Sequence, residues 1–277
     1  MKMNKLKHIR ITWYIVFALL SLLLLYPIFF ALANSFKTMQ DAFATITHLI
    51  PSAPTLDNFI HVFTRVDLLN ITGNSLFVAS IVTVFKLLTS ILAAYALVFL
   101  DFKYKNLVYF MLISTIFIPF TVTLIPNFIT ITSLGLRDSL FGVIVPQLGD
   151  AMGIFLIRQT MRMIPASLVE YARLENLGHF RIMKDIVIPL AKPGIVSTGI
   201  IFFVNSWNEF VWPMMILRTQ EQYTLPLALQ RFISAEAGHD FTYAMALAVL
   251  SMILPIVLFL IFQKHVIGTF TSSGIKG

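Results

Sequence analysis

The chain has 277 residues, of which 58% are hydrophobic and only 12% are charged. Because soluble domains carry about 25% charged residues, this composition excludes an ordinary soluble protein and predicts an all-α, polytopic membrane helix bundle. The sequence contains no cysteine, which excludes a disulfide framework and a thiolate metal site.

Six apolar segments are long enough to cross a bilayer, which takes about 20 residues. We therefore predict a single transmembrane domain, residues 1–277, with six membrane-spanning helices. The first segment follows a basic N-terminus, as in a secretory signal, but its apolar run exceeds the usual length of about 7–15 residues. We expect it to remain as an uncleaved helix. The predicted spans are residues 11–36, 70–100, 106–132, 139–161, 193–217 and 241–263.

Positive charge is distributed unevenly between the two ends of these spans. Most of the 20 Lys and Arg residues lie in the N-terminal tail and in the segments after the second, fourth and sixth spans. Short cytoplasmic loops carry such an excess of positive charge. The pattern predicts a multi-pass protein of the cell membrane with both termini cytoplasmic. It also explains the net charge of +7 without a nucleic acid as partner.

The first outer segment, residues 38–67, is interrupted by Pro51 and Pro54. Helical spacing of apolar residues over 56–66 then predicts a short helix on the membrane surface. Prolines inside spans free backbone carbonyls, so we also expect bent helices around a cavity. The prolines concerned are at positions 119, 126, 146, 213 and 255.

Three charged residues lie well inside the predicted spans, away from the span ends, where charge is costly and commonly functional. They are Lys86, Asp150 and Glu209. Lys86 could pair with Asp150 or Glu209, contact a substrate, or extend to the inner surface. Asp150 fits either a transport pathway or a helix–helix hydrogen bond.

A polar group in the fifth span shows helical spacing. Asn205, Glu209 and Trp212 are predicted to share one helix face, with Asn208 beside them. Amides, a carboxylate and an indole suit a sugar, which needs hydrogen bonds and stacks on aromatic rings. The same group also fits helix packing and an outer aromatic belt.

The longest polar interruption in the C-terminal half is residues 163–192, which we call the inner loop. Two short helices are expected there, joined by a turn around Asn176 and Gly178, because both residue types tolerate positive φ. The second helix fits residues 180–188, and Pro189 is expected to end it. Such a hinged pair fits a groove in a partner protein. Alternatively, it is a basic surface that lies on anionic headgroups.

The inner loop resembles the EAA loop of binding-protein-dependent ABC transporter permeases. That family has Glu-Ala-Ala, then Asp-Gly, then a hydrophobic residue followed by Leu-Pro. The sequence departs from it where Asn176 replaces Gly and Gly178 follows two residues later, so we expect the turn to differ. The residues at the matching spacing are Glu170, Ala172, Glu175, Ile188 and Pro189, with Tyr171 in place of the middle Ala and Glu175 in place of Asp.

Further stretches, in the same order along the chain, resemble the maltose-permease G-like branch of this family, which imports carbohydrates. Together they cover nearly the whole chain. They include the motifs at 54–59, 93–97, 153–159, 207–210 and 223–226, and the tail 274–277.

The resemblance implies a transport subunit, not an enzyme, of an ATP-driven importer for a sugar or polyol. It implies six partners: a second homologous permease, two ATPase subunits, an extracytoplasmic sugar-binding protein, the lipid bilayer and a small-molecule carbohydrate. The binding protein would dock at residues 38–67 and 218–240. Glu170 would pair with a basic residue in a groove of an ATPase subunit.

No cofactor is expected on this chain, because it has no Gly-x-x-x-x-Gly-Lys-Ser/Thr phosphate loop. ATP and magnesium would bind to the partner ATPase subunits. The six His residues are scattered, without metal-ligand spacing. Two rival classes remain open at this point, a membrane-embedded enzyme and a secondary transporter or channel.

Overall fold

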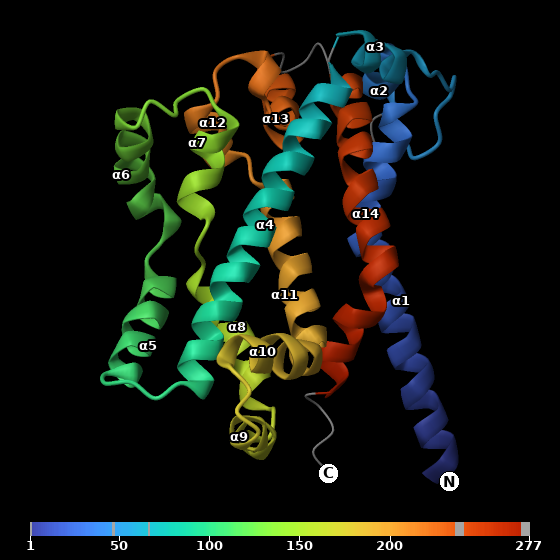
Figure 1. Cartoon of the computed structure of the whole chain (residues 1–277). Helices are drawn as coiled ribbons and strands as arrows, with labels where there is room; N and C mark the ends of the chain where they lie inside the picture. The colour runs from blue at the N-terminus through green and yellow to red at the C-terminus, as the bar shows by residue number, and fades with distance from the viewer. Residues whose placement is uncertain (1, 46–47, 66, 236–240, 273–277) are drawn as a thin grey trace. The chain divides into compact units, whose positions relative to one another are not determined.

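The computed structural model describes residues 2–45, 48–65, 67–235 and 241–272. All regular structure in this part of the chain is helical, which confirms the predicted all-α class. The chain forms two compact units, described separately below (Figure 1). The first comprises Met1–Leu68 and Leu229–Leu254, and the second comprises Leu69–Ala228 and Pro255–Gly277.

The predicted spans are present, but two of them are broken. Within the described residues, 4 helices are long and apolar enough to cross a membrane, and two bent helix pairs raise this number to 6. The long helices include α4 (Leu68–Phe99) and α11 (Ile188–Asn208), which continues the helix from His179. The other two are Thr12–Ser35 of α1 (Lys2–Ser35) and Phe241–Ile261 of α14 (Phe241–Ser272).

The third span bends by 98° between two helical halves, 105–117 and 120–133. Pro119 lies at the break with extended backbone, because it has no N–H and disfavours a helical residue before it. Pro126 lies inside the second half without ending it. The elements are α5 (Lys105–Ser114), the 3₁₀ turn η1 (Thr115–Phe117) and α6 (Phe120–Ser133).

The fourth span bends by 48° where η2 (Val145–Gln147) gives way to α8 (Ala151–Arg162). Its outer half is the short helix α7 (Leu140–Ile144). Asp150 is the N-cap of α8, and its side chain accepts a hydrogen bond from the Gly153 backbone N–H. A carboxylate at this position satisfies a donor at the start of the helix, so the break is stable inside the span.

The fifth span begins earlier and ends earlier than predicted. A separate inner-loop helix ending at Pro189 is wrong, because α10 (His179–Ile182) continues through the π-helical turn η3 (Met183–Val187) into α11. A π turn rearranges the backbone hydrogen bonds directly before Pro189, which cannot donate one. The helix then ends at Asn208, and the predicted remainder forms the separate helix α12 (Val211–Ile216).

In the first unit, the outer segment forms α2 (Met39–Ala44), which was not predicted, and α3 (Asp57–Arg65), the helix predicted from the spacing over 56–66. Lys37 is fully buried and donates hydrogen bonds to the carbonyls of Thr45 and His48 at 2.8 and 2.7 Å. Buried Asn58 donates to the carbonyls of Ser35 and Lys37. These bonds join the segment to the outer end of α1.

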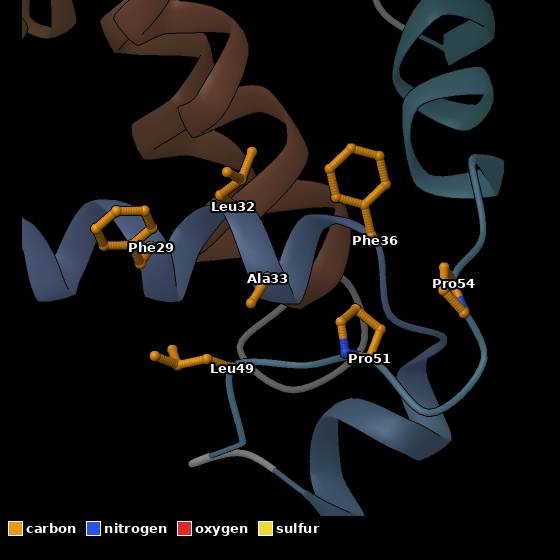
Figure 2. A pocket seen from close by; sticks show the side chains of 7 residues that line it. All are labelled: Phe29, Leu32, Ala33, Phe36, Leu49, Pro51 and Pro54. Carbon is orange, nitrogen blue, oxygen red and sulfur yellow. The ribbon is translucent and has the colours of Figure 1, made fainter.

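An apolar pocket of about 380 Å³ lies between the end of α1 and this segment. Figure 2 shows the side chains that line it: Phe29, Leu32 and Ala33 of α1, Phe36 directly after α1, and Leu49, Pro51 and Pro54 of the loop. The two prolines expected to break the segment therefore lie against the helix.

In the second unit, the outer end is closed by hydrogen bonds between α4 and the segment after α12. Asn74 donates to the carbonyls of Glu221 and Tyr223, and Ser75 accepts from the Leu225 N–H. Those residues lie in or beside η4 (Gln220–Gln222) and α13 (Leu225–Ala235). The inner loop, with α9 (Ala166–Leu174) and α10, lies at the opposite end of α4 (Figure 1).

Candidate functional site

The turn of the inner loop is carried by Asn176. Its φ of 57° is left-handed, and the hydrogen bonds from the Asn176 N–H to the Arg173 carbonyl and from the Leu177 N–H to the Ala172 carbonyl close a Schellman motif. Gly178 has ordinary extended backbone (φ −69°) and begins α10. The predicted turn is therefore present, but only Asn176 supplies positive φ.

Replacing Asn176 with Val should destabilise the inner loop by about 1–2 kcal/mol, because a β-branched residue is strained in the left-handed region. Asn176→Gly should leave stability unchanged or raise it, because Gly adopts this conformation freely. The midpoint of thermal unfolding of the purified chain measures both. Equal midpoints for the two variants would contradict the role of the turn.

An apolar core fixes the inner loop to the ends of two spans. The buried residues of this core bring together α4, α8 and both inner-loop helices at one end of the second unit. Of the predicted site residues, Ala172 belongs to this core. Its fully buried members (0% exposed) include Ala94, Ile157, Met161, Ile182, Val187 and Ala191. A shared core of this kind makes the loop and the spans move together.

The opposite side of α9 is exposed. Glu170, Tyr171 and Leu174 are all exposed and face away from buried Val169 and Ala172 by helical spacing. Tyr171 and Leu174 are 70% and 77% exposed, so two large apolar side chains share this side of α9 with the Glu170 carboxylate. The two other predicted coupling positions, Glu175 at the C-cap of α9 and Pro189 of α11, are also exposed.

Two polar contacts add to the core beneath the loop. The Arg173 guanidinium donates to the carbonyl of Phe99, in the last turn of α4. The Tyr95 hydroxyl of α4 lies 3.1 Å from Nδ1 of His179, the first residue of α10. The Arg173 guanidinium is a cation at the C-terminus of α4, where positive charge is favourable. Together the two contacts join the inner loop to α4, the second span.

The intramembrane charges Lys86 and Asp150 form an ion pair, with Lys86 Nζ 3.2 Å from Asp150 Oδ2. Of the alternatives left open by the sequence, pairing with Asp150 is the one found. The Lys86 ammonium also lies 5.3 Å from the centre of the Phe202 ring. The positive charge of Lys86 is thus compensated by the chain itself.

The predicted shared face of Asn205, Glu209 and Trp212 is wrong. The helix ends at Asn208, and Glu209 has extended backbone with its carboxylate accepting from the N–H groups of Val211 and Trp212 at 2.8 and 3.1 Å. The Glu209 carboxylate therefore satisfies the first two N–H groups of α12 from the position before its N-cap, Phe210. Asn205 and Asn208 are exposed on α11, whereas Trp212 is buried in an apolar cluster.

A charged residue, Asp138, connects two loops at the outer end of the second unit. Asp138 Oδ1 accepts from the N–H groups of Arg218 and Thr219 at 2.7 and 3.1 Å. These two bonds hold the pKa of the Asp138 carboxyl below its ordinary value. They join the loop between the third and fourth spans to the start of the segment 218–240, of which residues 236–240 lie outside the described residues.

Sequence reasoning missed the residues that let the spans approach one another. A Cβ on Gly194 of α11 would lie 2.3 Å from Thr160 Oγ1, and one on Gly153 of α8 would lie 2.2 Å from Phe202 Cζ. Gly inside a helix lowers helix stability by about 1 kcal/mol relative to Ala. The presence of such residues within a predicted span was therefore the available signal for close helix packing. Sequence reasoning also missed Arg173, because its contact with the Phe99 carbonyl depends on where α4 ends. In the described part of the chain, no group of three His, Cys, Asp or Glu residues could hold a metal ion.

Comparison with known families and proteins gives a consistent result. Residues 86–269 match the family described as binding-protein-dependent transport system inner membrane component. The arabinooligosaccharides transport system permease protein AraQ of Bacillus subtilis is 32% identical over 271 residues, covering 97% of this chain and 96% of that protein. The sn-glycerol-3-phosphate transport system permease protein UgpE of Brucella melitensis is 30% identical and covers 86% of this chain and 88% of that protein.

A solved structure shares the fold. It is a chain of a bacterial ABC transporter involved in the import of the acidic polysaccharide alginate, and it superimposes with a TM-score of 0.80 at 25% sequence identity. The likeness covers 93% of this chain and 96% of that chain.

Proposed function

Because the chain belongs to the family of binding-protein-dependent transport system inner membrane components, we propose that it is the permease subunit of an ATP-driven importer of neutral carbohydrates. It is a multi-pass membrane protein and a transport subunit, not an enzyme. It works within a transporter complex. We propose as its partners a second homologous permease, two ATPase subunits that bind ATP and magnesium, and an extracytoplasmic sugar-binding protein.

The observation that carries this proposal is the two-sided inner loop. One side of α9 packs into the core with α4 and α8, and the other exposes Glu170, Tyr171 and Leu174. An exposed carboxylate among exposed apolar side chains is suited to a groove with a basic residue. A pair of helices lying on anionic headgroups would instead present positive charge to them. The proposed ATPase contact is therefore the Glu170 side of α9.

The mechanism that follows is alternating access. ATP binding closes the ATPase pair and displaces the inner loop, which moves with α4, α8 and α11 because they share one core. The bundle then changes from inward-facing to outward-facing, and hydrolysis resets it. Shifting such a two-state equilibrium takes only a few kcal/mol of differential contact.

The proposed orientation places the inner loop in the cytoplasm. In the second unit, the end of α4, the start of α5 and the inner loop lie together (Figure 1), and Lys103, Lys105, Arg162 and Arg181 belong to that end. Arg137 and Arg218 belong to the opposite end. This excess fits the cytoplasmic side, and with six spans both termini are then cytoplasmic.

The charge balance inside the spans favours a neutral substrate. Lys86 and Asp150 neutralise each other, and the Glu209 carboxylate accepts from N–H groups at the start of α12. We propose that exposed Asn205 and Asn208 of α11 offer amides to sugar hydroxyls along the pathway. The relative that transports arabinooligosaccharides is thus a closer guide to the substrate than the relative that transports sn-glycerol 3-phosphate.

The docking surface can be tested directly, because the chain has no cysteine. In the co-purified complex, Leu174→Cys labelled with benzophenone maleimide should crosslink to an ATPase subunit on illumination. Phe102→Cys is the matched control, because it is exposed at the same end of α4 but lies outside the inner loop.

The expected result is an ATPase–permease band at least about ten-fold stronger from position 174 than from position 102. Crosslinking of position 174 to lipid alone would favour the headgroup surface and would contradict the proposed coupling.

A further inference from the structure

The two oxygens of the Asp150 carboxylate have different partners. Oδ1 accepts from the Gly153 N–H at 2.8 Å, and Oδ2 lies 3.2 Å from Lys86 Nζ. Both side chains are largely buried, with 15% of Lys86 and 25% of Asp150 exposed. The carboxylate therefore stabilises the start of α8 and attaches that start to α4 at the same time.

Asp150 and Lys86 lie at similar distances from the inner ends of their helices. Asp150 precedes the 12 residues of α8, which places it about 18 Å from the inner end of that helix. Lys86 stands on α4, which ends at Phe99, so it lies about 20 Å from the inner end. A charge at that depth is costly without a partner, and each residue is the other's partner.

Neighbouring groups of α4 hold the same break. Thr89 Oγ1 lies 3.1 Å from the Leu148 carbonyl oxygen, on the other side of the break, and also within reach of the Phe85 carbonyl of α4 at 2.9 Å. One residue further, Ser90 Oγ would lie 2.6 Å from a Cβ on Gly153. Side chains from one turn of α4 therefore contact residues on both sides of the bend in the fourth span.

Both helices that carry the pair end beneath the inner loop. The inner ends of α4 and α8 lie in the shared apolar core with Val169 and Ala172 of α9. We propose that the Lys86–Asp150 ion pair is a positioning pair for transport, which makes the inner half of the fourth span move with α4 when the inner loop moves. Displacement of the loop then reaches the break in the middle of the membrane.

This inference rests on the proposed function, and a double-variant series tests it in the reconstituted complex. The series is the unchanged chain, Lys86→Gln, Asp150→Asn and both together. Asn caps a helix as well as Asp does, so Asp150→Asn removes the charge and keeps the cap. The readouts are arabinotriose molecules taken up per ATP hydrolysed, ATP hydrolysis without arabinotriose, and the midpoint of thermal unfolding.

Each single variant leaves one charge alone, and should lower arabinotriose uptake per ATP by about ten-fold and raise hydrolysis without arabinotriose. The double variant should return both readouts to within about two-fold of the unchanged chain, because the two amides that replace the charges can hydrogen-bond to each other and keep α8 attached to α4 without leaving a charge alone. Rescue of this kind is not expected if each side chain contacts the substrate independently.

Single variants that lower only the unfolding midpoint would make the pair purely structural and would overturn the inference. A double variant as defective as the single variants would overturn it as well. If the unchanged complex takes up no arabinotriose, arabinotriose is not the substrate. ATP hydrolysis without arabinotriose then still tests the role of the Lys86–Asp150 pair.

Discussion

Uptake driven by ATP should fall about 100-fold when Glu170 is replaced by Lys. Glu170 is exposed on α9 and lies on the side of that helix opposite the core. The substitution therefore leaves the fold of the inner loop unchanged and converts attraction to a basic groove residue into repulsion. Initial rates of uptake into proteoliposomes that contain the complete complex measure the effect.

The control for this variant is Asp101→Lys, which makes the same change of charge at the neighbouring inner connection. Asp101 is 97% exposed, and its contact with Lys105 is long, at 3.7 Å, so its loss has little consequence. Normal uptake by the Glu170 variant would remove Glu170 from the coupling contact. Equal loss in both variants would show a general sensitivity to charge at this end of the protein.

Replacing Gly194 with Leu should destabilise the second unit by about 3 kcal/mol, the upper part of the range for overpacking. Helices α8 and α11 pack against each other, and at Gly194 a Cβ would meet three side-chain atoms of Thr160, at 2.3, 2.6 and 2.9 Å. Small residues permit such close approach between membrane helices. The midpoint of thermal unfolding and the yield of folded protein measure the effect.

Gly73→Leu provides the matched control, because a Cβ at that exposed position of α4 meets nothing within 4 Å. Thr160→Ala combined with Gly194→Leu should recover part of the loss by removing the two closest atoms. If Gly194→Leu and Gly73→Leu unfold at the same temperature, close packing of α8 on α11 is not what Gly194 provides.

The sequence predicted the helical class, the spans and the inner loop, because these depend on local composition. Long apolar runs need no knowledge of neighbours, and the turn was predicted around Asn176 and Gly178 from their tolerance of positive φ, which only Asn176 adopts. The bend at Pro119 was also predictable, since the lost N–H is a property of the residue itself.

The ends of the helices within the spans were harder to predict. A continuous apolar run predicts one long helix, whereas an acidic residue within the run can end one helix and begin another. Asp150 and Glu209 were interpreted as intramembrane charges in continuous helices, yet the carboxylate of each accepts from N–H groups at the start of a new helix. An acidic residue before an apolar run is also a signal for a helix start. At both positions the acidic residue marks a helix start inside a predicted span.

Contacts between segments distant in the sequence could not be predicted. Lys86 had several possible partners, and only the fold brings Asp150 within 3.2 Å of it. In the same way, Arg173 reaches the Phe99 carbonyl because the core sets α9 beneath the end of α4. Local patterns identify such residues as unusual, but packing decides their partners.

Transport in proteoliposomes with and without ATP tests the central claim most directly. The complex is reconstituted with its ATPase subunits accessible to added ATP and with the binding protein and radiolabelled arabinotriose on the opposite side. We expect arabinotriose to move only when ATP and magnesium are supplied, and a sodium or proton gradient alone to drive none. Uptake driven by a gradient without ATP would contradict the account and would favour a secondary transporter.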